Sequence, residues 1–342
     1  MFICHFSLWA PARSGLFEFV IDQIKAERNL GLRSEFINCD VERPDPARFQ
    51  YEGIQAVPWN VALDKSAIWV LHRSIPYPLY NEVQNRKSVA ILHGTSEIMI
   101  LHEVDSRSTD DKFNLHLSFL KNFEKVVAIT KSDYDIMKQY DTENKVVYIN
   151  DAIDVNRFSP CGYAWPFRYR PALISTCNIR INKHPSFYIW AMPSLIRRIP
   201  SARLNIFGIN LVEMPTWRNV VLKSPSISVA IENIHGQFFD LRPFLRGADI
   251  SLNSNYNGIF SRDSMEAMAC GCSVVAFTNE HTEYVCERRI DSIVDAICRA
   301  WEDILEDPEG QIEKNRAYAV EHFSMEKIVR EGYIPLYESL RR

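Results

Sequence analysis

Short apolar runs of strand length alternate with segments of helical periodicity along most of this 342-residue chain. In the first half, the strand-like runs lie at 2–8, 34–39, 67–71, 88–92, 125–129 and 145–149. In the second half, they lie at 172–177, 202–207, 219–222, 248–252 and 273–277. Strands that alternate with helices predict parallel sheets covered by helices on both faces, so the alternation places the chain in the α/β class.

The alternation is interrupted once. Residues 151–170, DAIDVNRFSPCGYAWPFRYR, are irregular and rich in Pro, Gly and aromatic residues, which is typical of a linker. A chain of 342 residues, 46% of them apolar, can form two packed cores. We therefore predict two doubly wound, parallel-sheet domains that face each other across a cleft.

Composition narrows the functional classes. The net charge of −4 gives no overall basic field that would draw the protein to nucleic acid or anionic lipid. The eight cysteines are scattered through apolar runs, as expected for reduced, buried thiols. Cys270 and Cys272 flank a glycine but lack a second ligand pair at zinc spacing, so we predict core filling and no metal.

Two features that are absent from the sequence predict a cytoplasmic protein. No run of 18 or more apolar residues is present, and the N-terminal segment lacks a basic region and a small-residue cleavage site. Residues 112–125, KFNLHLSFLKNFEK, combine aromatic side chains with three lysines. Such a segment is more often core than membrane surface, and peripheral contact with the inner membrane face is the alternative.

Ligands of open parallel sheets bind at the carboxyl ends of the strands, which directs attention to three loops. Ser14 and Gly15 precede a helix, where backbone amides can receive an anion or simply form a turn. His93 follows the strand at 88–92 and is either a cleft residue or a structural histidine. The third loop, after 172–177, begins with Asn178 and contains two cations, Arg180 and Lys183. These two cations are either a phosphate clamp or a pair of solvated charges.

A fourth loop leads into the helix predicted at 262–270. Amides at the helix start, Ser261-Arg262-Asp263, together with the helix dipole, can hold a phosphate. Glu266 lies one turn further on, where its carboxylate can accept two hydrogen bonds from a sugar diol. The alternative is that Glu266 is a surface glutamate of the helix whose charge only interacts favourably with the helix dipole.

The segment SMEAMACGCSVVAF resembles the "EAMACGxPVVA" element of retaining glycosyltransferases of the GT-B fold, specifically glycosyltransferase family 4. LHGTSE, VVAITKSDYDIM and DAIDVNRFSP resemble further elements of that family, in the family's order. The resemblance implies an N-terminal Rossmann-like acceptor-side domain, a C-terminal Rossmann-like nucleotide-sugar-binding domain, and a final helix that returns to the first domain. The corresponding ranges are 1–160, 161–321 and 322–342.

Several positions depart from the family pattern. Gly258 replaces the first acid of the paired-glutamate motif, and Asn178 stands where the family has a phosphate-binding arginine, a role that Arg180 could take over. The glycine pair of the first loop is reduced to Ser14-Gly15. The chain therefore resembles a divergent member.

The resemblance also implies roles. Glu266 would bind the ribose of a nucleotide-diphosphate sugar, and Lys183 with Arg180 would neutralise the diphosphate. The start of the helix at 261–263 would add amide dipoles, and His93 would lie near the sugar. No cofactor beyond the donor substrate is implied, and no Asp-x-Asp element occurs at a strand end to bind a metal.

The acceptor is left open among a glycan, a lipid-linked molecule and a small molecule. Two further readings are a glycosyltransferase acting on modified DNA bases and a degenerate, non-catalytic GT-B partner protein. The acidic net charge argues against the DNA reading, because a groove that follows phosphates is basic.

Overall fold

The computed structural model describes most of the chain. The described residues are 1–7, 15–39, 50–59, 64, 66–72, 82–83, 86–93, 117, 119–176, 185–208, 219, 223–236, 240–253, 255, 259–278 and 280–341. The chain divides into two compact units, the first formed by Met1–Asp154 with Ser324–Arg342 and the second by Val155–Phe323.

The first unit contains a sheet whose described strands run in the order β3-β4-β2-β1-β5-β6-β7-β8. All neighbouring pairs are parallel except β3 with β4, which are antiparallel. The strands are β1 (Phe2–Ser7), β2 (Arg33–Asn38), β3 (Gln50–Tyr51), β4 (Ile54–Pro58), β5 (Ile68–His72), β6 (Ser88–Leu92), β7 (Lys125–Ala128) and β8 (Val146–Tyr148).

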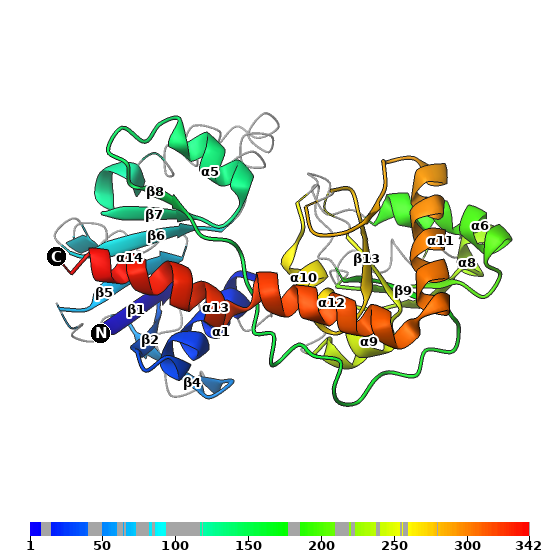
Figure 1. The fold of residues 1–342 in the computed structure, drawn as a ribbon, viewed down its shortest axis with the longest axis horizontal. Coiled ribbons are helices and arrows are strands. Elements are labelled where there is room, and N and C mark those ends of the chain that lie inside the picture. Colours follow the sequence, from blue (N-terminus) through cyan, green and yellow to red (C-terminus); the bar gives the residue numbers. More distant parts are fainter. Residues whose placement is uncertain are drawn as a thin grey trace. The chain divides into compact units, whose positions relative to one another are not determined.

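Both faces of this sheet are covered. On one face, apolar residues of the strands pack against α1 (Gly15–Asn29) and against the C-terminal helices (Figure 1). Those are α13 (Met325–Ile328), the π-helical turn η2 (Val329–Tyr333) and α14 (Ile334–Ser339). The other face packs against Phe119, Phe123 and Met137, the last of which belongs to α5 (Lys131–Lys138). Residues 324–341 are thus a structural part of the first unit.

The second unit is built on an all-parallel sheet with the strand order β11-β10-β9-β12-β13-β14 among its described residues. Helices α6 and α11 pack on one face, while α10 contacts α9 and α12 (Figure 1). The strands are β9 (Ala172–Thr176), β10 (Arg203–Phe207), β11 (Ile231–Ile234), β12 (Ile250–Leu252), β13 (Ser273–Ala276) and β14 (Tyr284–Val285). The helices are α6 (Ser186–Arg198), α8 (Pro225–Ser228), α9 (Arg242–Gly247), α10 (Arg262–Ala269), α11 (Ile290–Glu306) and α12 (Pro308–Phe323).

The predicted α/β class and the two parallel-sheet domains are confirmed. One predicted strand, 219–222, needs correction. Asn219 is helical and the other three positions lie outside the described residues, while the strand that pairs with β10 is β11. Because β11 carries two polar residues in its short sequence, IENI, it lacks the continuous apolar run by which most of the other strands were recognised; β3, β4 and β14 were not predicted either.

Gly271 connects α10 to β13 in a backbone conformation that favours glycine. Its φ is +99°, its amide donates to Met268 O at 2.9 Å, and the amide of Cys272 donates to Ala267 O at 3.0 Å. These two bonds form a Schellman motif, which ends the helix and satisfies its last carbonyls. A Cβ at this position would lie 2.8 Å from Ile312 Cγ2.

The cysteines on either side of Gly271 are buried in the core of the second unit. Burial raises the pKa of Cys270 to about 12, and it raises the pKa of Cys272 well above its usual value. The Cys272 thiol donates to Leu245 O at 2.9 Å. Both thiols therefore fill the core as neutral groups.

We expect Gly271→Ala to lower the free energy of unfolding by about 1–3 kcal/mol, because it adds left-handed strain and a close contact. Urea denaturation followed by circular dichroism measures this. Gly31→Ala is the matched control, since Gly31 has a φ of +81° but open space around its Cβ position. An equal loss in both variants would show that the Ile312 contact has no effect.

Candidate functional site

Strand order reverses beside β9 in the second unit. The chain leaves β9 for β10 and β11 on one side and then returns to β12 on the other. In open parallel sheets such a reversal opens a crevice at the carboxyl ends of the two strands, and ligands bind there. The residues that follow β9 and β12 are therefore the first candidates for a ligand site.

Ser261 begins α10 just beyond β12. Its backbone carbonyl accepts hydrogen bonds from the amides of Ser264 and Met265 at 2.9 and 3.1 Å. Its hydroxyl does not cap the helix and instead lies 3.3 Å from Asn253 Oδ1. Because the amides of the first turn and the helix dipole both favour negative charge, the start of α10 can receive an anion such as a phosphate.

Asn253 holds the loop between β12 and α10. It is 1% exposed, and its Oδ1 accepts from the amide of Asn255 at 2.9 Å, in addition to the Ser261 contact. Its Nδ2 donates to Ile259 O at 3.0 Å, and its own carbonyl accepts from the Tyr188 hydroxyl at 2.7 Å. Sequence reasoning missed this residue, although a polar residue directly after a buried strand at the carboxyl edge was a usable signal.

Glu266 and Arg262 form a buried ion pair within α10. Arg262 Nε lies 3.4 Å from Glu266 Oε1, and the two side chains are 9% and 8% exposed. A buried carboxylate is costly unless an opposite charge accompanies it, and Arg262 provides that charge. Glu266 is thereby kept at the base of the α10 start as a hydrogen-bond acceptor, which is the requirement for binding a sugar diol.

An aromatic cluster supports the segment before Ser261. The Phe260 ring stacks on Phe323 with centroids 5.7 Å apart, and it meets the His281 ring edge-on at 5.2 Å. His281 Nδ1 is 3.1 Å from the Tyr318 hydroxyl. Burial, and secondarily the nearby His322, lowers the pKa of His281 to about 4, so the folded protein keeps this imidazole neutral.

In the first unit the strand order reverses beside β1, between β2 and β5. His93 follows β6 at the carboxyl edge, and its Nε2 lies 2.9 Å from His72 Nδ1. His72 Nε2 lies 2.9 Å from His5 Nδ1, and His5 Nε2 lies 2.8 Å from Glu27 Oε2. The structure therefore joins the predicted His93 to three buried residues that the sequence did not single out.

The other predicted positions divide into two groups. Gly15 is the first residue of α1, and Ser261, Arg262, Asp263 and Glu266 are brought together at the start of α10. Ser14, Asn178, Arg180 and Lys183 lie outside the described residues, as does Gly258.

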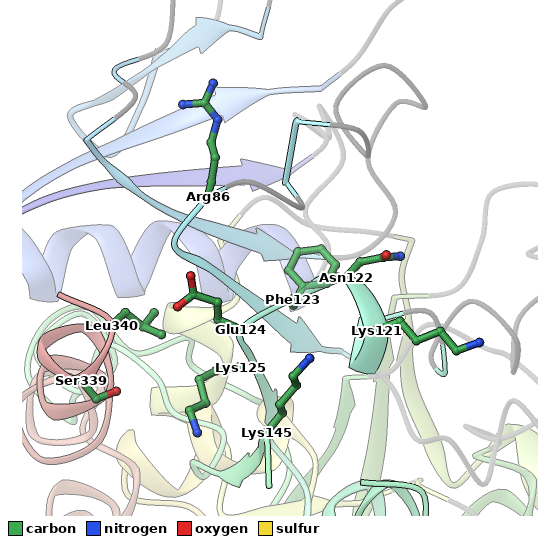
Figure 2. Close-up of a pocket in the computed structure, with 9 residues that line it drawn as sticks. All are labelled: Arg86, Lys121, Asn122, Phe123, Glu124, Lys125, Lys145, Ser339 and Leu340. Atoms are coloured by element: carbon green, nitrogen blue, oxygen red, sulfur yellow. The ribbon is translucent and has the colours of Figure 1, made fainter. Parts of the chain in front are cut away.

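A cavity of about 540 Å³ lies in the first unit, at the opposite edge of its sheet from His93. Figure 2 shows that Lys125, Lys145 and Glu124 line it, close to the amino-terminal ends of β7 and β8. Arg86 also lines it, but this guanidinium pairs with Glu82 at 2.7 Å and stacks over Trp69. Since ligands of parallel sheets bind at the carboxyl edge, this cavity is not the candidate site.

The segment that suggested membrane contact is only partly described. Phe119 and Phe123 are 3% and 1% exposed and belong to the core beneath the first sheet. Within the part of the chain that the structure describes, no helix has the length and apolar character needed to cross a bilayer.

Comparison with known proteins agrees with this geometry. Residues 170–306 match the family described as "Glycosyl transferases group 1", a range that contains β9, β12 and α10. No curated protein matches the sequence.

Solved structures with the same fold cover the chain almost completely. Sucrose-phosphate synthase from Thermosynechococcus elongatus has a TM-score of 0.75 at 16% identity, over 99% of this chain and 98% of its own. The pneumococcal O-GlcNAc transferase GtfA, in complex with UDP and GlcNAc, has a TM-score of 0.69 at 11% identity, over 100% of this chain and 99% of its own. Anabaena HepE, in complex with UDP and glucose, has a TM-score of 0.68 at 13% identity, over 98% of both chains. The chain therefore has the GT-B fold of these structures, and the match to a glycosyltransferase family covers residues 170–306.

We expect the pH dependence of stability to report the neutral state of His281. Unfolding returns the imidazole to a pKa near 6.5, so between about pH 4 and 6.5 the unfolded chain binds a proton that the folded protein does not bind. This contribution to stability is unchanged above pH 6.5 and is lost as the pH falls from 6.5 toward 4. Because His281 is only partly buried, we expect a loss of about 1–2 kcal/mol.

Urea denaturation at pH 7 and at pH 4.5 measures the effect. His281→Gln cannot take up the proton. In this variant, the free energy of unfolding should therefore differ between the two pH values by about 1–2 kcal/mol less than in the unmodified protein. Lys121→Gln is the control, because this exposed residue belongs to the first unit and lies outside the aromatic cluster. An unchanged pH dependence in His281→Gln would contradict the assignment.

Proposed function

We propose that the protein is a retaining glycosyltransferase that moves a sugar from a nucleoside diphosphate sugar to an acceptor hydroxyl without a metal ion. The proposal depends mainly on one observation. Within the matched glycosyltransferase domain, a buried glutamate and an anion-accepting helix start lie together where the strand order reverses.

The donor is assigned to the second unit. The Glu266 carboxylate accepts hydrogen bonds from the ribose hydroxyls, with Arg262 offsetting its charge at 3.4 Å. The diphosphate lies against the first turn of α10, where Ser261 directs its hydroxyl to Asn253 and leaves the helix start to the ligand. UDP is the first nucleotide to test, because the structures of GtfA and HepE contain it.

The leaving diphosphate needs positive charge as the glycosidic bond breaks. We assign this role to Lys183 with Arg180, in the segment after β9, beside Asn178. The amides at the start of α10 add dipoles oriented toward the same charge, and Gly15 with Ser14 contributes backbone amides from the first loop. Preorganised groups of this kind stabilise a developing charge without a metal ion.

The reaction exchanges one bond at the anomeric carbon. The bond from that carbon to the diphosphate oxygen breaks, and a bond to the acceptor oxygen forms on the same face. The acceptor hydroxyl gives its proton to the departing phosphate oxygen. His93, at the carboxyl edge of the first sheet, binds a hydroxyl of the sugar.

We expect Glu266→Gln to weaken donor binding by about 1.5–3 kcal/mol, the contribution of a charge-assisted hydrogen bond. Isothermal titration calorimetry with UDP and UDP-sugars measures the loss. Glu302→Gln, an exposed change on α11, should bind the donor as the unmodified protein does. Unchanged donor affinity in Glu266→Gln would show that Glu266 does not bind the ribose and only forms its ion pair with Arg262.

We expect transfer to persist in EDTA and to give a product that keeps the anomeric configuration of the donor. Lys183→Ala should lower kcat by about 10²-fold, the scale of losing one preorganised charge in the transition state. Proton couplings at the anomeric centre, measured by NMR of the product, report the configuration. Inversion would refute the mechanism, and activity restored only by Mn²⁺ would refute the charge assignment.

Assays with several acceptor classes separate the remaining readings. Transfer to modified DNA alone would replace the proposed acceptors. Donor binding without transfer or donor hydrolysis would indicate a non-catalytic partner protein.

A further inference from the structure

A row of side chains crosses the first sheet from α1 to the carboxyl edge. It begins at Glu27 of α1, passes through His5 of β1 and His72 of β5, and ends at His93 after β6. The three contacts are 2.8, 2.9 and 2.9 Å long. We call these four residues the histidine row.

The row is almost completely buried at its inner end. Glu27 and His5 are 0% exposed and His72 is 1% exposed, whereas His93 is half-buried at the sheet edge. Ring packing fixes the orientation of the outer end, because Phe19 meets the His93 ring edge-on with centroids 4.7 Å apart. A polar connection therefore runs from the core to the edge where ligands of such sheets bind.

The Glu27 carboxylate accepts at both oxygens. Oε1 accepts from the Tyr337 hydroxyl at 2.9 Å and from Gln23 Nε2 at 3.3 Å. Oε2 accepts from the Ser34 hydroxyl and faces His5 Nε2. Since a carboxylate surrounded by donors acts only as an acceptor, the proton in the contact with His5 belongs to the imidazole.

For a neutral His5, the direction of every other contact in the row then follows. A neutral imidazole carries one N–H, so a His5 that donates through Nε2 must accept at Nδ1. Burial, and secondarily the neighbouring His93 and His5, holds the pKa of His72 well below its usual value, so this ring is neutral. His72 accordingly donates through Nε2 and accepts at Nδ1 from His93 Nε2.

We infer that Glu27 acts through His5 and His72 as a positioning residue that sets the tautomer of His93, so that His93 Nδ1 accepts a hydrogen bond from a hydroxyl of the bound sugar. This role rests on the proposed function, whereas the tautomer itself does not. His93 is the group that would touch the sugar, and the other three residues determine which of its nitrogens carries the proton.

Histidine ring ¹⁵N NMR tests the tautomer without any ligand or activity. The sample is the full-length protein labelled with ¹⁵N-histidine, and comparison with His93→Gln assigns the signals of His93. We expect the proton on Nε2 in His93, His72 and His5. A proton on Nδ1 of His93 would overturn the inference, whether or not the protein transfers sugars.

Glu27→Gln tests the origin of the tautomer. The amide oxygen is expected to keep the position that accepts from Tyr337 and Gln23, which turns the amide N–H₂ toward His5. The contacts then reverse along the row, and the proton of His93 moves to Nδ1. Unchanged ring signals in a folded Glu27→Gln protein would overturn the inference, and the measurement on the unmodified protein decides if this variant does not fold.

Glu18→Gln is the matched control. Glu18 lies on the same helix, is 1% exposed and accepts from the Tyr51 hydroxyl at 2.8 Å, outside the histidine row. It should leave the ring signals and the activity unchanged. For Glu27→Gln, we expect kcat/KM for transfer to fall by about 10-fold to 100-fold, the scale seen when a metal-ligating histidine loses the hydrogen-bond partner that orients it. Equal kinetics in the two variants would restrict the row to a structural role.

Discussion

Parallel strand pairing is the constraint on which both units depend. A parallel strand can be reached only by a crossover that returns the chain to the same end of the sheet, so all carboxyl ends gather at one edge. In each unit the first strand lies inside the sheet and the order reverses beside it, at β1 and at β9. The candidate donor site and the half-buried outer end of the histidine row both lie at such carboxyl edges.

Periodicity predicted most of the fold because the strands of these sheets are buried on both faces. α1 covers the predicted range, Gly15–Asn29, and β6 covers Ser88–Leu92, again as predicted. Where a strand is short or polar, this signal fails. β14 has two residues, and β11 has two adjacent polar residues, Glu232 and Asn233, at the edge of the sheet, so pairing with a neighbour rather than their own sequence makes them strands.

The candidate site was predictable where one segment carries it. Ser261 and Glu266 lie five positions apart on one helix, so a local motif was enough to find them. The histidine row could not be found in this way, because His5 and His72 are separated by 67 positions and meet only through the pairing of β1 with β5. Asn253 is intermediate, since its burial follows from the strand before it but its hydrogen bonds depend on the folded loop.

The contact between Tyr337 and Glu27 joins the two separate stretches of chain that make up the first unit. A ribosome synthesises residues 1–154 first, then the whole of the second unit, and only afterwards the segment that contains Tyr337. Until then, the carboxylate in the core of the first unit lacks one of its donors, and one face of the sheet lacks Tyr333 and Leu336. Domains of nascent chains commonly fold in order from the N-terminus, but here the second unit can complete its core before the first. A growing chain would therefore expose the uncovered face of the earlier sheet to chaperones for the whole time needed to make the later one.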